Sequence, residues 1–291
     1  MLEDVTKVRK TAKAFGFEWT THGRLQELYR SEEALFEEFA SYRLPPTFFA
    51  GKRVLDAGCG MGRYSYVAAQ LGAATVVGFD LHDGVRAAHR LTAPLGPVRV
   101  LRANIFALPF RQGSFDAIMS IGVVHHTGDA HQAIRALTEL LRPGGQLFIQ
   151  VYASRGPRRD RWNARLLRLT NKVPTRLLYA FAHGLVALMY VPVARHLMKI
   201  GLHYVTLVSY SPRRTFRRNV ADTFDWHCAP HKSFHTRDEL ISLLHACGLT
   251  HVRVTNPDYH GGITLLAEKP HEQHRGRTSA PLLGPRDGGN L

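Results

Sequence analysis

The stretch RVLDAGCGMGRYSYVAAQLGAATVVGFD, residues 53–80, contains a glycine-rich turn between an apolar segment and a helical one. Gly58, Gly60 and Gly62 alternate within the turn, and Asp80 ends the next apolar segment. Glycine allows positive φ and a close approach to a ligand, and a helix N-terminus offers free N–H groups. A carboxylate about twenty residues later can accept hydrogen bonds from ribose hydroxyls. The stretch therefore predicts a nucleoside cofactor site.

The spacing of the glycines favours one cofactor over another. The dinucleotide pattern G-x-G-x-x-G would require glycine at position 63, where this chain has Arg63. Asp56 precedes the turn, and a carboxylate beside a helix N-terminus suits a ligand with an ammonium group better than one with a pyrophosphate. These residues favour S-adenosylmethionine (SAM) over NAD.

Short apolar strands alternate with helical segments over residues 51–152, which predicts an α/β fold with a parallel sheet and right-handed crossovers. The other segments differ in composition. The sequence predicts one domain in five parts: an N-terminal helical segment (1–50), the cofactor-binding core (51–152), an inserted helical lid or substrate region (153–232), the C-terminal part of the core (233–270) and a disordered tail (271–291).

The net charge of +15 is concentrated in one region. Between Arg155 and Arg218 there are fourteen Lys or Arg residues and a single acid, Asp160. This concentration predicts an anionic partner near one face, and a solvated basic surface is the alternative. The three cysteines lie far apart and the first residues contain no apolar signal segment, so we expect a cytoplasmic protein.

Residues 177–194 carry no charged side chain and approach the length that spans a bilayer. Pro192 and Gly184 lie within this run, and arginines flank it, so an interfacial helix is favoured over a span. The sequence predicts a lid that contacts an anionic membrane peripherally, at the inner face of the membrane. Ordinary capping of the active site by the same helices is the alternative.

Four motifs follow one another in the core: VLDAGCGMGRYS, VVGFD, ANIFALPFRQGSFDAIMSIGVVHHTGD and LLRPGGQLFIQVY. In this order they resemble class I SAM-dependent methyltransferases of the bacterial small-molecule type, similar to methyltransferase type 11. The phrases AFGFEW and DTFDWHCAPHKSFHTRDELISLLHACGL resemble members that act on sugar, quinone or lipid-linked substrates. The resemblance implies a Rossmann-like, seven-stranded, mostly parallel sheet with helices on both faces and an antiparallel last strand.

The same resemblance implies which residues bind SAM and its product S-adenosylhomocysteine. The glycine loop and Asp56 would contact the methionine part, and Asp80 with Leu81 would hold the ribose. Asn104 stands where many relatives have Asp, so its amide oxygen would meet the adenine amino group. The implied cofactor residues are Asp56, Gly58, Gly60, Gly62, Asp80, Leu81, Asn104, Ile105, Ile121, Gly122 and Val123, the last three facing the sulfonium.

Two neighbouring histidines are candidates for the chemistry. His125 and His126 follow the fourth expected strand at its carboxyl end, where folds of this class bind substrate. A histidine there could accept a proton near neutral pH. The alternative is that one of them only shapes the loop by hydrogen bonding to the backbone.

The segment FDWHCAPHKSFHT, residues 224–236, collects further polar side chains. Its C-x-x-H-x-x-x-H spacing could suggest a metal site, but no second cysteine pair supports it, and we expect no metal. Substrate contacts are the favoured interpretation and plain loop structure is the alternative. The substrate candidates are Asp225, Trp226, His231, His235 and Tyr259.

The function predicted from the sequence is methyl transfer to an oxygen or carbon atom of a small-molecule or lipid-linked acceptor of the sugar, quinone or polyprenyl type. An RNA methyltransferase and a non-catalytic SAM-binding scaffold are the alternatives. Nucleic acid is judged an unlikely partner, because the basic region is interrupted by long aliphatic runs and no RNA-binding module is recognised. The oligomeric state is not predicted.

Overall fold

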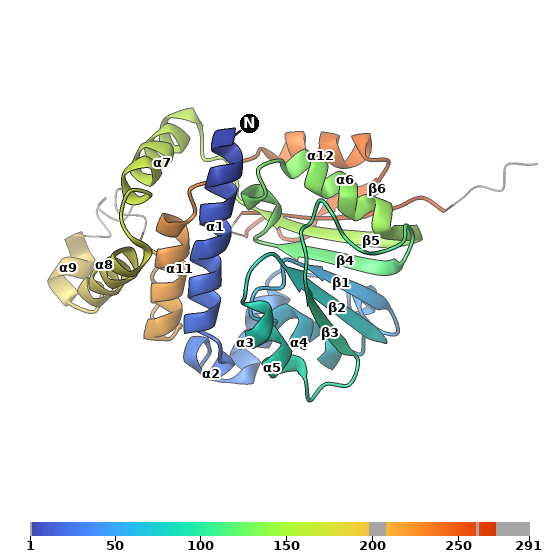
Figure 1. Ribbon diagram of the computed structural model, residues 1–291, viewed down its shortest axis with the longest axis horizontal. Helices are drawn as coiled ribbons and strands as arrows, with labels where there is room; N and C mark the ends of the chain where they lie inside the picture. Colours follow the sequence, from blue (N-terminus) through green and yellow to red (C-terminus); the bar gives the residue numbers. More distant parts are fainter. Residues whose placement is uncertain (1, 198–207, 260–261, 272–291) are drawn as a thin grey trace, which may run out of the picture.

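The computed structural model describes residues 2–197, 208–259 and 262–271 (Figure 1). Its centre is one seven-stranded sheet in the order β3-β2-β1-β4-β5-β7-β6. Strands β1 to β5 run parallel, and β7 runs antiparallel to both β5 and β6. The predicted sheet is therefore confirmed, including its antiparallel strand. The strands are β1 (Arg53–Ala57), β2 (Thr75–Asp80), β3 (Val98–Arg102), β4 (Phe115–Ile121), β5 (Leu141–Val151), β6 (Thr250–Val254) and β7 (Ile263–Glu268).

Helices cover both faces of this sheet (Figure 1). Strand side chains alternate between faces, so Val54 packs with the helices of one face and Leu55 with those of the other. The first face carries α3 (Glu32–Ala40), α4 (Arg63–Gln70) and α5 (Val85–Thr92), and the second carries α6 (Ala130–Leu140) and α12 (Arg237–Ala246). Asp129 caps α6, and Thr236 with Glu239 forms a capping box at α12.

Beyond the carboxyl ends of the strands lies a separate group of helices, with its own apolar core formed mainly by α8 and α11. Ala182 and Phe224 are fully buried there, and Ala14 joins them from α1. Helix α11 contacts α1, α7 and α8, so it links the N-terminal helix to the inserted segment (Figure 1). The group consists of α1 (Leu2–Thr21), α7 (Pro157–Thr170), α8 (Thr175–Leu188), α9 (Pro192–Leu197) and α11 (Phe216–Cys228). The short helices α2 (Leu25–Leu28), η1 (Pro46–Phe48) and η2 (Val124–His126) complete the described elements.

The apolar run at residues 177–194 is divided between two helices in the structure. Helix α8 ends at Leu188, and α9 begins at Pro192, which fits the first turn of a helix because it has no N–H to offer. None of the helices in the described ranges has both the length and the hydropathy that a bilayer-spanning segment needs.

The structure gives the bounds of β5 and of the described part of the C-terminal segment. Strand β5 begins at Leu141, and near its start Gly144 and Gly145 exchange backbone hydrogen bonds with Lys269. The predicted disordered tail lies outside the described residues from 272 onward. The division of the chain into five parts stays a prediction.

The glycine that opens α4 allows two helices to pack closely. Gly62 has a φ of 88°, and a Cβ at this position would lie 2.9 Å from the Ala88 Cα on α5. An alanine would therefore meet both backbone strain and a rigid neighbour. Gly51 has a similar φ of 69° but nothing within 4 Å of the corresponding Cβ. An alanine at position 51 would therefore meet the backbone strain without the close contact.

We expect Gly62→Ala to lower the free energy of unfolding by about 1–3 kcal/mol more than Gly51→Ala does, because overpacking adds to strain. Denaturant titration of both variants measures the difference. Equal losses would mean that α4 and α5 adapt to the added methyl group.

Candidate active site

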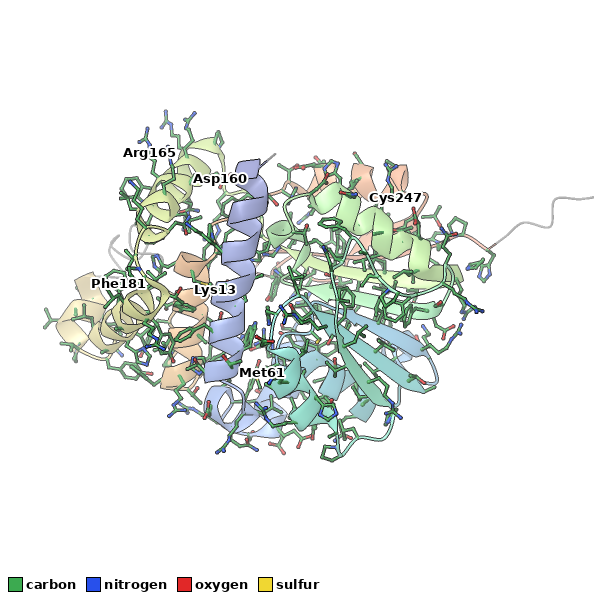
Figure 2. The ribbon with its side chains drawn as sticks, in the orientation of Figure 1. Lys13, Met61, Asp160, Arg165, Phe181 and Cys247 are labelled. Atoms are coloured by element: carbon green, nitrogen blue, oxygen red, sulfur yellow. The ribbon has the colours of Figure 1, made fainter. Side chains whose placement is uncertain are left out.

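A pocket lies at the carboxyl ends of β1, β2 and β4, where parallel α/β sheets bind ligands. Loop residues after these strands line one side, and α1 lines the other. Figure 2 labels Met61 in the loop after β1 and Lys13 on α1. All the predicted cofactor residues except Asp56 and Gly62 line this pocket.

The glycine loop is joined to the end of β2 by the Asp80 carboxylate and by backbone hydrogen bonds from the Gly58 and Cys59 N–H groups to the Phe79 carbonyl oxygen. Asp80 accepts hydrogen bonds from the backbone N–H of Gly60, at 2.8 Å, and from its neighbour Leu81, at 2.7 Å. A carboxylate offers about four lone-pair sites, so Asp80 keeps capacity for ligand hydroxyls. At Gly58, whose φ is 80°, a Cβ would overlap the Val123 methyl groups, so glycine lets the loops after β1 and β4 approach.

Asp56 lies under the loop and is not part of the pocket lining. It is 2% exposed and accepts a hydrogen bond from the Ser65 hydroxyl at 2.6 Å. Burial raises the pKa of the Asp56 carboxyl to about 7. Asp56 thus anchors the first turn of α4, and its predicted contact with the cofactor stays a prediction.

The loop after β3 shapes another wall of the pocket. The Asn104 amide oxygen accepts a hydrogen bond from the Phe106 N–H at 3.1 Å, which forms a local turn. Asn104 and Ile105 both line the pocket. The amide oxygen expected to meet adenine therefore already holds one backbone partner.

Helix α1 supplies a wall that sequence reasoning did not identify. Thr11, Phe15 and Trp19 line the pocket from this helix. The Trp19 ring lies 3.3 Å from where a Cβ of Gly60 would be, and the Arg63 guanidinium lies 5.2 Å from the centre of this ring. Phe15 and Trp19 stand four residues apart in the AFGFEW phrase, a spacing that puts them on one helix face.

A buried ion cluster supports the wall behind Arg63. The Glu38 carboxylate accepts hydrogen bonds from Tyr29 and Tyr64, each at 2.9 Å, and from Arg218 at 3.2 Å. Arg63 donates to the Tyr29 hydroxyl at 3.2 Å. Burial alone would raise the pKa of Glu38, but Arg218 and Arg63 outweigh it and lower this pKa to about 2.

The two candidate histidines have different surroundings. His126 lines the pocket and its Nδ1 lies 2.9 Å from the His231 carbonyl oxygen, so Nδ1 carries the proton and Nε2 the lone pair. Burial and the nearby Lys232 lower the pKa of His126 to about 3. Nε2 has no hydrogen-bond partner among the described residues. His125 is fully buried, packs 4.0 Å from the Tyr152 ring and does not line the pocket.

Asp225 faces the pocket from α11. One of its carboxylate oxygens, Oδ2, accepts a hydrogen bond from the Tyr152 hydroxyl at 3.2 Å. The other, Oδ1, is buried and lacks a hydrogen-bond partner within the part of the chain that the structure describes. Burial raises the pKa of Asp225, and Lys232 opposes this increase.

The other predicted substrate residues lie away from the pocket lining. Trp226 stacks on Tyr152 with ring centres 4.8 Å apart, and Tyr259 packs on Tyr42 in the core. His235 lies between Ser233 and Glu239, 2.8 Å from each, beside the cap of α12. His231 contributes its backbone to His126. Within the described ranges no three His, Cys, Asp or Glu side chains are arranged to hold one metal ion.

Comparison with known proteins identifies the core. Residues 55–149 match the family described as "Methyltransferase domain", and this range includes the end of β1, all of β2 and most of the pocket loops. Over these residues the chain carries a methyltransferase domain, in agreement with the motifs that resemble SAM-dependent methyltransferases. The cofactor of this domain is SAM, as the glycine spacing predicts.

Three relatives of the methyltransferase domain differ in the acceptors that their names describe. The probable tRNA methyltransferase 9B of Bos taurus is 38% identical over 112 residues, which are 35% of this chain and 22% of the relative. The ubiquinone biosynthesis O-methyltransferase of Xanthomonas axonopodis pv. citri (strain 306) is 39% identical over 117 residues, 39% of this chain and 47% of the relative. The tRNA U34 carboxymethyltransferase of Methylococcus capsulatus is 36% identical over 110 residues, 37% of this chain and 34% of the relative.

The chain thus spans less than half the length of these curated relatives, and the similarity is confined to the methyltransferase domain. Two of the three names describe enzymes that modify tRNA. The sequence-based judgement that nucleic acid is an unlikely partner is therefore wrong. Its reason, the absence of a recognised RNA-binding module, carries little weight when relatives with tRNA substrates share the same domain.

The ion cluster predicts a change of stability with acid. The Glu38 carboxyl has a pKa of about 2 in the folded chain against an ordinary value of 4.5, so its stabilising effect is complete above about pH 4.5 and is lost towards pH 2. We expect Glu38→Gln to remove this contribution, on the order of 3 kcal/mol at neutral pH, and to flatten the loss of stability between these pH values.

Denaturant unfolding at a series of pH values measures the effect, and Glu37→Gln on the exposed side of α3 is the control. The prediction would be contradicted if the free energy of unfolding of Glu38→Gln fell with acid as steeply as that of the unchanged protein.

Proposed function

We propose that this chain transfers the methyl group of SAM to an oxygen or carbon atom of a small-molecule or lipid-linked acceptor that loses a proton in the reaction. The observation that carries the proposal is the lining of the pocket. Loops of the methyltransferase domain form one side, and two proton-accepting atoms without partners among the described residues, Nε2 of His126 and Oδ1 of Asp225, lie in its lining residues.

The residues on the cofactor side fit SAM. When bound, SAM supplies a methyl group on a positively charged sulfur. A nucleophile can attack the methyl carbon and displace the sulfur. Asp80 would accept hydrogen bonds from the ribose hydroxyls with the lone pairs that Gly60, Leu81 and the His82 Nε2 leave free. Arg63 lines the same pocket, and its guanidinium suits the cofactor's carboxylate. Ile105 and Phe106 offer apolar contacts for adenine.

The residues on the acceptor side call for a ligand with hydrogen-bond donors. A buried carboxylate oxygen without a partner costs about 1–3 kcal/mol, and an acceptor hydroxyl would remove that cost. Asp225 is the better proton acceptor of the two candidates, because burial raises its pKa towards neutrality while burial lowers that of His126. Asp225 Oδ1 would accept the acceptor's proton when the acceptor atom bonds to the methyl carbon, and the electrons of the broken carbon–sulfur bond would stay with the departing sulfur.

His126 acts in this proposal as a neutral positioning group. Its low pKa keeps Nε2 unprotonated throughout the neutral range, so this nitrogen can accept a hydrogen bond from the acceptor molecule. The hydrogen bond from Nδ1 to the His231 carbonyl fixes the ring orientation. His125 supports Tyr152, which holds Asp225, by ring packing.

A second candidate acceptor is RNA. Relatives named as tRNA methyltransferase and tRNA carboxymethyltransferase support it, and so does the net charge of +15. The relative named as a ubiquinone biosynthesis O-methyltransferase supports a small acceptor and transfer to oxygen. The small acceptor is the first candidate because Phe15 and Trp19 of α1 line the pocket and offer apolar contacts to such a molecule.

Transfer of tritium from methyl-labelled SAM into fractionated extract of the producing cells tests both candidates. The extract is separated into lipid, small-molecule and RNA fractions, and label in either of the first two supports the proposal. Label in RNA alone overturns it in favour of the second candidate. If no fraction becomes labelled although SAM binds, the chain is a non-catalytic SAM-binding scaffold.

The role of Asp80 gives a binding prediction. We expect Asp80→Asn to weaken SAM binding by about 1.5–3 kcal/mol, the contribution of hydrogen bonds to a charged group. Asp83→Asn is the matched control, because Asp83 is exposed and pairs with Arg102 outside the pocket. Calorimetry with purified protein measures both. Unchanged affinity in the Asp80 variant would remove this residue from the cofactor site.

The role of Asp225 gives a kinetic prediction. With the labelled fraction as substrate, we expect Asp225→Asn to reduce turnover about 10²-fold or more while SAM affinity is kept, as for loss of a general base. We expect turnover to fall as acid protonates Asp225. Tyr152→Phe removes a hydrogen bond that lowers the pKa of Asp225, so this acid limb should move to higher pH.

The same assay on His126→Asn should show a raised KM with a smaller loss of turnover, as for a positioning group. A full loss of turnover in His126→Asn combined with an active Asp225→Asn would reverse the two roles.

A further inference from the structure

Helix α8 is apolar on its exposed side as well as on its buried side. Leu178, Ala182 and Leu185 pack into the core of the inserted segment. On the opposite side Leu177, Phe181 and Leu188 are 61%, 50% and 49% exposed, with Gly184 between them. A helix that is apolar all round is ordinarily buried, so a second contact for this exposed side is expected.

Exposed apolar side chains are concentrated in this part of the molecule. Of the thirteen large apolar side chains that are exposed in the described residues, ten lie between Trp162 and Phe216. Val193 on α9 is 71% exposed, and Leu169 at the end of α7 is 65% exposed. We call the exposed side chains Leu169, Leu177, Phe181, Leu188 and Val193 the apolar patch.

Helix α7, which precedes α8 in the chain, is basic on its exposed side. Asn163, Leu167 and Thr170 face the protein, and arginines occupy the opposite side of the helix. We call Arg158, Arg161, Arg165 and Arg168 the basic face. The one acid of α7, Asp160, is held by Ser154 and the Arg155 N–H. Figure 2 shows Arg165 on α7 and Phe181 on α8 in the part of the molecule away from the sheet.

We propose that the apolar patch and the basic face together dock this chain on an anionic lipid surface. Apolar side chains enter the boundary between head groups and acyl chains, and arginines pair with lipid phosphates. The combination of apolar and basic side chains favours an anionic lipid surface over RNA and over a second copy of the chain. RNA would leave the side chains of the apolar patch without a contact, and a second copy of the chain would bring two arginine-rich helices together. The docking surface is independent of methyl transfer, so its failure leaves the proposed function standing.

The test is sedimentation of the full chain with vesicles of phosphatidylcholine alone or with phosphatidylglycerol added. We expect binding to the anionic vesicles, weak binding to the neutral ones, and release as salt rises from about 0.05 M to about 0.5 M. The variant Arg161→Gln/Arg165→Gln/Arg168→Gln should bind about a hundredfold more weakly. Leu177→Ser/Phe181→Ser should bind at least about tenfold more weakly at equal charge.

Two matched variants serve as controls, and SAM binding checks the fold of every variant. Arg111→Gln/Arg237→Gln/Arg253→Gln removes the same charge from exposed positions elsewhere, and Leu71→Ser removes an exposed leucine from the end of α4. Both should bind vesicles like the unchanged chain. Equal weakening by the control arginine variant would overturn the proposal, because net charge alone would then explain binding.

Two further outcomes overturn the docking proposal. In the first, the chain ignores anionic vesicles and binds an RNA oligonucleotide with a steep salt dependence that the basic face controls. In the second, it ignores vesicles and forms a dimer in solution that Leu177→Ser/Phe181→Ser dissociates.

Discussion

A buried group of charged side chains joins the N-terminal segment, the cofactor-binding core and the inserted segment, and the geometry of the pocket depends on it. Glu38 comes from the N-terminal segment, Arg63 from the first helix after the glycine loop, and Arg218 from the inserted segment. Arg218 is 6% exposed, and it pairs with both Glu38 and Asp222. A buried charge without its partner is costly, so each section fixes the position of the others. This cluster ties α11 to α3 and α4, and the Arg63 guanidinium also lies 5.2 Å from the centre of the Trp19 ring on α1.

The sequence predicts the sheet because the signals for its strands are local. Apolar runs, the turn at Gly58 and the spacing to Asp80 each involve a few neighbouring residues, and the strands lie where these signals indicate. The candidate site is predicted less completely, because its walls come from distant segments. Residues 11–19 meet the glycine loop and Asp225 only through tertiary packing, which no local pattern encodes.

Tertiary packing, which no local pattern encodes, also decides which of the two candidate histidines faces the pocket and what the inserted segment covers. His125 and His126 are neighbours in one turn of η2, so a single rotation decides that His126 faces the pocket while His125 faces the core. The inserted helices are helical as predicted, but α1 covers the pocket, and of α7, α8, α9 and α11 only α11 contributes a described lining residue, Asp225. The inserted segment contributes chiefly an outer surface, where its basic and apolar residues are exposed.

Helix α1 spans both halves of the pocket. Trp19 lies against the cofactor loop, and Phe15 packs 5.0 Å from the His126 ring on the acceptor side. A helix that covers two neighbouring ligands makes their exchange interdependent. If both ligands bind as proposed, each would leave past the same helix, because Trp19 and Phe15 stand one turn apart on α1. A movement of α1 would then couple the release of the spent cofactor to that of the methylated acceptor.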